Sequence, residues 1–362
     1  MDSSPTPALT ALAQGDAAPQ HGPRPLPLFL NILWRETECD PELRRRAFAG
    51  LRKYQEARRS PSASSAKCVA TAGTARLLRY GAVNYRFPVV FIPSLINPPQ
   101  VLDLSESRSL LRHMGAAGHE AYLVDWGTPT VQDATLGLDG HVTERLLPML
   151  STLSRPPILV GYCLGGSLAL AAAALQSFPA VSTIAAPWKF DCFAKADLDL
   201  IGGLWESAKS MCESIGYVPM EVLQSGFWAM DPARTIRKYA DFADLAVESD
   251  EERAFLAVED WANGGAPLTF AAGRDLFEQF YAANASGNDQ WRINGRTISP
   301  SDLECPSLSI VSIGDRIVPA AAGPRLREKW SLSLGHVGMV VGGRAREMLW
   351  EPLSVWLSSH GG

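Results

Sequence analysis

Apolar residues recur along the chain in short continuous runs, separated by turn residues and by stretches with helical spacing. Runs of this kind are typical of strands that are buried on both faces of a sheet. They lie at residues 89–92, 121–124, 158–160, 181–186 and 308–313. Because helical stretches alternate with these runs, the pattern predicts an α/β fold with a mostly parallel central sheet.

The segment between the fourth and fifth runs has a different pattern. Residues 187–294 contain many aromatic and acidic side chains at helical spacing. We predict a helical cap here, inserted into a core that is formed by residues 67–186 and 295–362. The aromatic side chains, among them Trp205, Phe270 and Tyr281, are expected to fill the cap, and a few are candidates for the lining of a substrate channel.

The N-terminal region predicts a tail, two helices and a linker. Residues 1–24 are rich in Pro, Ala, Ser and Gln and lack the charged and apolar parts of a secretory signal, so we expect a disordered tail. Residues 25–66 read as two helices and a linker, and Asp40 and Pro41 mark the start of the second helix. The apolar run at 26–34 is too short to span a bilayer, which predicts no transmembrane segment.

Charge and cysteine content exclude some classes of function. A net charge of -5 without a long run of Lys and Arg argues against nucleic-acid binding. The six cysteines are scattered, with no CxxC pair, so neither a metal site nor a disulfide framework is indicated. Most of them are expected to be small buried side chains in a reducing cytosol. The missing secretory signal and membrane span predict a cytoplasmic protein.

One cysteine lies in a context that predicts a nucleophile. Cys163 stands in Gly-Tyr-Cys-Leu-Gly-Gly, directly after the third apolar run and before an Ala/Leu-rich helical stretch. This is the pattern of a strand–nucleophile–helix elbow, with Cys in the place of Ser. Gly161 and Gly165 are expected because side chains there would collide with the neighbouring strand and helix. The alternative is a tight glycine-rich turn with a buried cysteine.

A base and an acid are expected later in the chain, in the order nucleophile, acid, histidine. His336 lies in a glycine-flanked loop, whereas His360, the other histidine after Cys163, is near the chain end. Asp315 directly follows the fifth apolar run, whereas Asp302 precedes that run. We therefore predict that His336 is the base and Asp315 the acid, with a surface-loop histidine and a structural aspartate as the alternatives.

An oxyanion hole needs two backbone N–H donors. The first is expected at Leu164, immediately after the nucleophile, and the second in the loop after the first apolar run, at Ile96.

These motifs resemble the polyhydroxyalkanoate synthases, and within that family the short-subunit, class III-like enzymes. The resemblance spans roughly residues 86–342. Its blocks are Gly161–Gly166, Ile96-Asn97, Val101–Leu104, Tyr122–Gly127, Trp291–Thr297, Gly314–Pro319 and Gly335–Gly342.

The resemblance implies an α/β-hydrolase fold with an inserted helical cap, and a Cys163–His336–Asp315 triad. It implies an acyltransferase that polymerises 3-hydroxyacyl-CoA into polyhydroxyalkanoate through an acyl thioester on Cys163, with release of CoA. No cofactor is expected, since acyl-CoA is the substrate. The partners it implies are acyl-CoA, the growing polyester, a second synthase subunit or granule proteins, and a homodimer through the cap, with a granule-associated location.

Two other functions stay open at this stage. The first is a Cys-dependent hydrolase, such as an intracellular polyhydroxyalkanoate depolymerase or a thioesterase, which would use the same triad with water as the acceptor. The second is a non-catalytic granule-binding protein on a hydrolase scaffold. Products formed from 3-hydroxybutyryl-CoA, and the effect of Cys163→Ala, discriminate among the three.

Overall fold

The computed structural model describes residues 22–59, 66–80 and 88–361. Contacts divide them into two compact units. One unit contains the described residues before position 60 together with Asp231–Glu259, and the other contains the remainder. The expected tail and linker fall almost wholly outside the described residues.

The larger unit is built on an eight-stranded sheet with the order β1-β2-β4-β3-β5-β6-β11-β12. Its strands are β1 (Lys67–Ala72), β2 (Ala75–Tyr80), β3 (Val89–Ile92), β4 (Ala121–Asp125), β5 (Ile158–Tyr162), β6 (Val181–Ile184), β11 (Ser307–Ser312) and β12 (Glu328–Leu332). β2 is antiparallel to both β1 and β4, and every pairing from β4 to β12 is parallel. This order, with its antiparallel second strand, is that of an α/β-hydrolase fold, as predicted.

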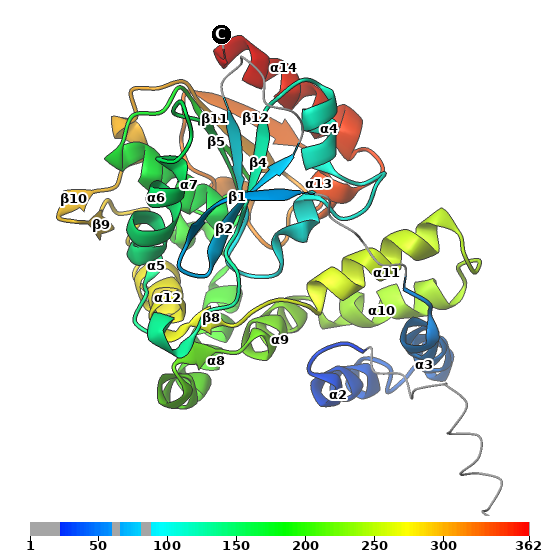
Figure 1. Ribbon diagram of the computed structural model, residues 1–362. Coiled ribbons are helices and arrows are strands. Elements are labelled where there is room, and N and C mark those ends of the chain that lie inside the picture. The colour runs from blue at the N-terminus through cyan, green and yellow to red at the C-terminus, as the bar shows by residue number, and fades with distance from the viewer. Residues whose placement is uncertain (1–21, 60–65, 81–87, 362) are drawn as a thin grey trace, which may run out of the picture. The chain divides into compact units, whose positions relative to one another are not determined.

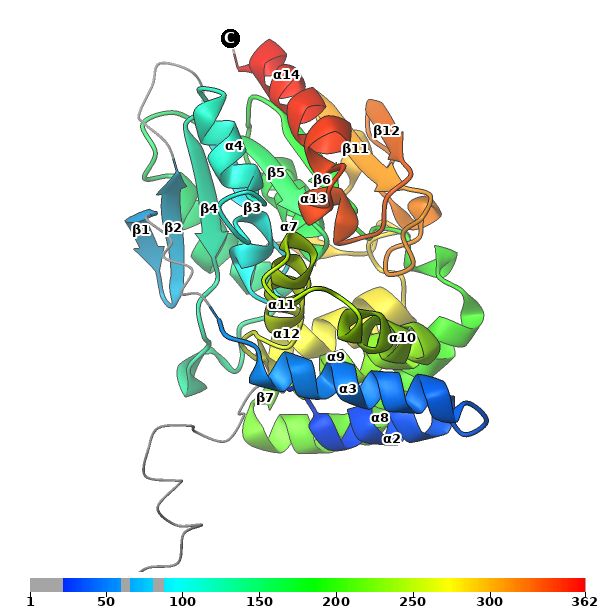
Figure 2. The same cartoon turned by 90° about the vertical axis from the view of Figure 1, so that its right-hand side faces the viewer.

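Helices cover both faces of this sheet. Figures 1 and 2 show α4, α13 and α14 on one face, and Figure 1 shows α5, α6 and α7 on the other. The helices of this unit are α4 (Leu110–Ala116), α5 (Leu138–Gly140), α6 (Leu147–Leu150), α7 (Leu164–Leu175), α8 (Lys195–Ile215), α9 (Met220–Met230), α12 (Phe270–Arg274), α13 (Gly338–Val341) and α14 (Glu351–His360). Three π-helical turns extend them, at His141–Leu146, Asp275–Ala282 and Arg346–Trp350.

Short elements complete the larger unit. The 3-10 turns are Pro99–Leu102, Val131–Asp133, Phe190–Cys192, Pro300–Asp302 and Ala320–Ala322. Two small ribbons pair β7 (Tyr217–Val218) with β8 (Leu268–Thr269) and β9 (Arg292–Ile293) with β10 (Arg296–Thr297).

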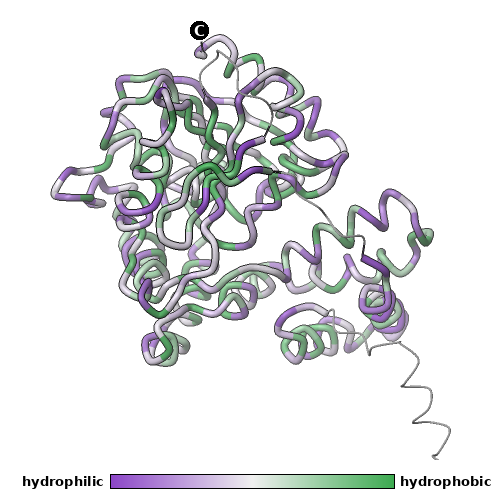
Figure 3. Tube along the Cα trace, in the orientation of Figure 1, coloured by the Kyte–Doolittle hydropathy of each residue, from purple (hydrophilic) through white to green (hydrophobic). Residues whose placement is uncertain are grey.

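All five apolar runs contain a strand that is buried on both faces, although the fifth strand ends at Ser312 and Ile313 is 75% exposed. Every residue of β3, β4, β5, β6 and β11 is buried, and Figure 3 shows the most hydrophobic stretches on these central strands. The fourth run was expected to reach residue 186, but β6 ends at Ile184 because the next residue, Ala185, has a positive φ of 49°. A backbone in that region leaves the extended conformation.

The smaller unit packs α2 (Leu26–Glu36), α3 (Pro41–Glu56), α10 (Pro232–Ala243) and most of α11 (Asp250–Ala262). The predicted start of the second N-terminal helix is confirmed. The Asp40 side chain caps α3 by accepting a hydrogen bond from the Leu43 N–H at 2.9 Å, and Pro41 is the first helical residue. The unit is held by buried aromatic rings, with Tyr54 and Tyr239 at 5.8 Å between centroids.

The predicted cap segment, 187–294, is shared between the units. α8, α9 and α12 belong with the sheet, whereas α10 and most of α11 belong with the N-terminal helices. A capping role for this segment stays a prediction. Among the described residues, none of the helices combines the length and the apolar character needed to cross a bilayer.

Candidate active site

Cys163 lies at the sharp turn between β5 and α7. Its backbone has a φ of 54° and a ψ of -132°, a conformation that L-residues rarely adopt. Two hydrogen bonds hold this turn: the Cys163 N–H donates to the Ile184 carbonyl at 2.9 Å, and the Gly166 N–H donates to the Cys163 carbonyl at 2.8 Å. The strain therefore sits where the neighbouring strand and the first turn of α7 fix the backbone on both sides.

The flanking glycines allow the strand, the helix and the loop after β3 to approach each other closely. A Cβ at Gly161 would lie 2.3 Å from the Cα of Gly166. A Cβ at Gly165 would lie 2.1 Å from the Ile92 carbonyl oxygen and 2.4 Å from that of Pro93. Because these obstacles are backbone atoms, no side-chain rotation could relieve them. Glycine is therefore required at both positions for this packing.

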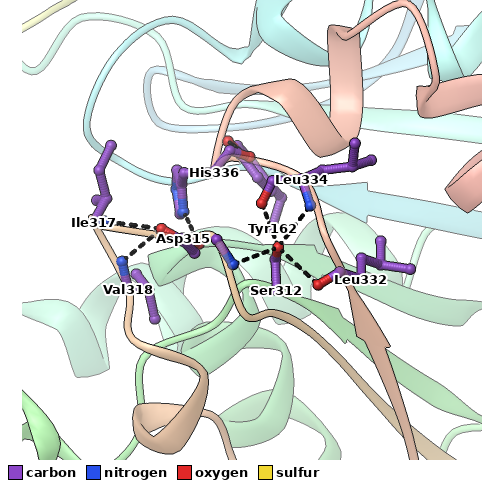
Figure 4. Close-up of polar contacts among 9 residues, drawn as sticks. Tyr162, Ser312, Asp315, Ile317, Val318, Leu332, Leu334 and His336 are labelled. Carbon is purple, nitrogen blue, oxygen red and sulfur yellow. Dashed lines mark hydrogen bonds and ion pairs between the residues drawn. The ribbon is translucent and has the colours of Figure 1, made fainter. Parts of the chain in front are cut away.

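The structure brings Asp315 and His336 together from two neighbouring strand ends (Figure 4). His336 Nδ1 lies 2.7 Å from Asp315 Oδ2. The other carboxylate oxygen, Oδ1, accepts hydrogen bonds from the N–H groups of Ile317 at 2.8 Å and Val318 at 2.9 Å. The His336 side chain is 7% exposed and that of Asp315 is fully buried. The acid is thus locked by its own loop, with one oxygen left for the imidazole.

The charge of the Cys163 side chain acts on the His336 imidazole, whereas the joining of Cys163 to His336 and Asp315 in a catalytic triad stays a prediction. Burial acts to lower the pKa of His336. The negative charge of a Cys163 thiolate and the hydrogen bond to Asp315 oppose burial and raise that pKa to about 10. Since Nδ1 faces the Asp315 carboxylate, Nε2 is the ring nitrogen left to exchange a proton with the nucleophile. A pKa above neutrality favours the protonated imidazolium form of His336 at neutral pH.

Two further side chains contact His336 or the loop before it, and sequence reasoning did not single them out. The Tyr162 ring packs 5.3 Å from the His336 ring, and its hydroxyl donates to the His336 carbonyl at 3.3 Å. Burial, with the nearby charges of Cys163 and Asp315, raises the pKa of Tyr162 well above 10. The Ser312 hydroxyl contacts the loop before His336. The available signals were a polar residue directly before the nucleophile and another at the end of a buried strand.

The loop after β3 packs against the elbow, as the position of Gly165 requires. Trp126 Nε1 donates to the Pro93 carbonyl at 3.0 Å, and Trp261 Nε1 donates to the Pro98 carbonyl at 2.7 Å, which anchors both ends of the loop. The N–H of Ile96 donates to the Ser94 hydroxyl at 3.0 Å. A bound oxyanion would have to compete for this donor, so the role of Ile96 stays a prediction.

Leu164 is the first residue of α7. Its N–H is one of the donors that the start of a helix leaves without an intrahelical partner, and it adjoins the nucleophile. Its role as the other oxyanion donor likewise stays a prediction.

Aromatic side chains of the predicted cap approach the site. The Tyr281 ring contacts those of Phe190 at 4.9 Å and Phe193 at 5.4 Å. Burial, followed by the charge of Cys163, raises the pKa of Tyr281 above its usual value. This cluster therefore reaches the neighbourhood of the nucleophile.

The expectation that most of the cysteines are buried is wrong, because Cys212 is buried whereas Cys39, Cys68 and Cys192 are exposed. All six cysteines are free. In the part of the chain that the structure describes, His, Cys, Asp and Glu side chains form no group of three that could hold a metal ion.

Comparisons with known proteins point in one direction. No protein-family model matches the chain. The chain is 29% identical over 313 residues to the poly(3-hydroxyalkanoate) polymerase subunit PhaC of Haloferax mediterranei, covering 79% of this chain and 62% of that protein. It is 25% identical to the PhaC subunit of Thiocystis violacea, covering 77% of this chain and 83% of that protein. For the Synechocystis PhaC subunit the identity is 27%, with coverages of 75% and 78%.

Solved structures resemble the chain less closely. A structure from Sulfolobus solfataricus has a TM-score of 0.49 at 11% identity, covering 82% of this chain and 99% of that one. The structure of VinJ has a TM-score of 0.46 at 15% identity, covering 83% and 99%. The fold assignment rests on the strand order. By sequence, the chain is similar to poly(3-hydroxyalkanoate) polymerase subunits, and its strand order is that of an α/β-hydrolase fold, as its motifs predicted.

Proposed function

We propose that this chain is an acyltransferase that polymerises 3-hydroxyacyl units from coenzyme A into polyhydroxyalkanoate, with Cys163 as the nucleophile. The observations that carry the proposal are the 2.7 Å contact between His336 and Asp315 and the strained strand-to-helix turn at Cys163. The sequence likeness to PhaC subunits supports the substrate class. Because the match spans about three fifths of the Haloferax protein, the activity of the whole relative enters only as part of this proposal.

In the first half-reaction, the Cys163 sulfur attacks the thioester carbonyl of a 3-hydroxyacyl-CoA. The carbonyl oxygen becomes negatively charged and is stabilised by backbone N–H groups, for which Leu164 and Ile96 are the candidates. The C–S bond to coenzyme A then breaks. The proton on His336 Nε2 passes to the leaving thiolate, so that CoA-SH departs and an acyl thioester remains on Cys163.

In the second half-reaction, the 3-hydroxyl group of another hydroxyacyl unit attacks the acyl thioester. His336 accepts the hydroxyl proton, and Asp315 stabilises the imidazolium that forms. An ester bond forms, and the Cys163–acyl bond breaks. A cysteine suits this chemistry because its thioester stays activated and its thiolate leaves easily.

Transfer rather than hydrolysis requires that water be kept from the acyl thioester. Phe190, Phe193 and Tyr281 form an aromatic cluster of the predicted cap, and the charge of Cys163 acts on Tyr281. We assign water exclusion to this cluster. A cytoplasmic, granule-associated location and partnership with a second subunit, granule proteins or a second copy through the cap belong to the same proposal.

The test is incubation with 3-hydroxybutyryl-CoA, followed by measurement of free CoA, insoluble polyester and free 3-hydroxybutyrate. We expect CoA and polyester to appear together, and Cys163→Ala to abolish both. Cys39→Ala is the matched control, because Cys39 is exposed and belongs to the smaller unit. Release of CoA with free hydroxyacid and without polyester would instead assign the chain as a thioesterase. An active Cys163→Ala enzyme would refute the nucleophile.

A further inference from the structure

We propose that Ser312 is a positioning residue whose hydroxyl holds the loop that carries Asp315 against the loop that carries His336. The proposal rests on the function proposed above, because it concerns the same acid and base. Ser312 is the last residue of β11 and is 1% exposed. It lies three positions before Asp315 along the chain.

The contacts of Ser312 begin where the ladder between β11 and β12 ends. Ser312 pairs with Leu332, the last residue of β12. Beyond this pair the two strands continue into separate loops. The loop after β11 carries Asp315 and is called the acid loop, and the loop after β12 carries His336 and is called the base loop. The Ser312 hydroxyl oxygen accepts a hydrogen bond from the Leu334 N–H at 3.0 Å. It also contacts the Gly314 N–H at 3.4 Å, so it bridges both loops.

The hydroxyl proton adds a further link. Both the Leu332 carbonyl, at 3.1 Å, and the Leu334 carbonyl lie within hydrogen-bond reach of the Ser312 oxygen. Since a hydroxyl has one proton, it donates to one carbonyl at a time. In either case the donor and acceptor groups around Leu334, two residues before His336, are held by a side chain from the strand that leads to Asp315 (Figure 4).

The contacts of the Ser312 hydroxyl affect catalysis through the geometry of the His336–Asp315 contact. The acid is already fixed within its own loop by the N–H groups of Ile317 and Val318. The base loop is fixed against β5 by the Tyr162 hydroxyl. Ser312 ties the two loops to each other directly, in addition to the contact between His336 and Asp315. Without its hydroxyl, we expect the 2.7 Å contact between Nδ1 and Oδ2 to lengthen or to be populated less often.

Weakening the contact between Asp315 and His336 should change the pH dependence of activity. The groups that face the imidazole are the Asp315 carboxylate, the Cys163 sulfur and the Tyr162 phenol. The hydrogen bond to Asp315 raises the pKa of His336, so weakening it lowers that pKa. The alkaline limb of the activity profile should then move to lower pH. A residue that supported only overall stability would not move this limb.

The chain offers a matched control in the same strand. Ser309 also lies in β11 and is also buried, but its hydroxyl has no hydrogen-bond partner among the residues that the structure describes. Ser309→Ala therefore removes a buried strand serine without removing a link between the two loops. We expect it to keep the wild-type activity and pH profile.

The experiment measures kcat and KM for CoA release from 3-hydroxybutyryl-CoA across the neutral and alkaline range, with Cys163→Ala as the blank for spontaneous thioester hydrolysis. Ser312→Ala should lower kcat by about tenfold, with little change in KM, and should shift the alkaline limb to lower pH. Ser312→Thr, which keeps the hydroxyl, should restore both. If Ser312→Ala does not fold, Ser312→Cys keeps the side-chain size with a weak hydrogen bond and is judged by the same criteria.

The two proposals fail in different ways. If Cys163→Ala is inactive while Ser312→Ala has the rate and pH profile of Ser309→Ala, the positioning role is wrong and the proposed function stands. If Cys163→Ala releases CoA at the wild-type rate, the proposed function itself is wrong, whatever the Ser312 variants do.

Discussion

Replacing Asp315 with asparagine would change the chemistry of the site with little change in its shape. The N–H groups of Ile317 and Val318 both donate to Oδ1. The asparagine oxygen must stay in that position, because the opposite amide orientation would direct an NH₂ group at two donors. The NH₂ group then takes the place of Oδ2 and points at His336 Nδ1, 2.7 Å away.

This orientation forces the wrong imidazole tautomer. With an amide donor opposite it, Nδ1 has to accept, so neutral His336 carries its proton on Nε2, the nitrogen that must accept a proton from the attacking group. The same exchange lowers kcat by about 10⁴-fold in a Ser-His-Asp triad. A thiol ionises more easily than a hydroxyl, so we expect a smaller loss in Asp315→Asn, of about 10²- to 10³-fold. That corresponds to roughly 3–4 kcal/mol of transition-state stabilisation.

The assay is CoA release under single-turnover conditions, with thermal unfolding to show that the fold is kept. Asp302→Asn is the matched control, since Asp302 is exposed and precedes β11 rather than following it. A variant of Asp315 that kept more than about a tenth of the wild-type rate would refute the assigned role. So would a loss that the control variant reproduced.

Three other predictions concern packing, pH and the loop after β3. Gly165→Ala should destabilise the fold by at least about 3 kcal/mol in urea unfolding, because the new Cβ meets backbone oxygen at 2.1 Å, whereas Gly202→Ala in α8, with nothing within 4 Å, should stabilise it by about 0.5–1 kcal/mol. The pKa of His336 is raised on folding from 6.5 to about 10, so its stabilising contribution is complete below about pH 6.5 and is lost as the pH rises towards 10. The difference in unfolding free energy between wild type and His336→Gln should shrink over this window, and a constant difference would contradict the reasoning. Trp126→Phe leaves the buried Pro93 carbonyl without its 3.0 Å donor, so calorimetry should show a loss of about 1–3 kcal/mol, together with a lower kcat.

Local sterics explain why much of this protein can be predicted from its sequence. The central strands are continuous apolar runs, because a strand covered on both faces needs no polar side. The elbow can be predicted because the positive φ at Cys163 and the close backbone approach at Gly161 and Gly165 restrict which residues can occupy adjacent positions of the sequence. For the same reason Asp40 and Pro41 marked the start of α3. Asp315 and His336 were placed by a rule of chain order, and the structure brings them into contact.

Tertiary packing decided what those rules leave open. The contact of Ser312 with Leu334 joins residues 22 positions apart, and it exists only because β11 and β12 end side by side. The N–H of Ile96 pairs with Ser94, a choice made by the fold of the loop. The division of the 187–294 segment between two units could not be predicted from the sequence either, since an amphipathic pattern does not identify the element that a helix packs against. Periodicity records that a helix buries one face, whereas the partner that covers this face is set by which distant elements the folded chain brings together.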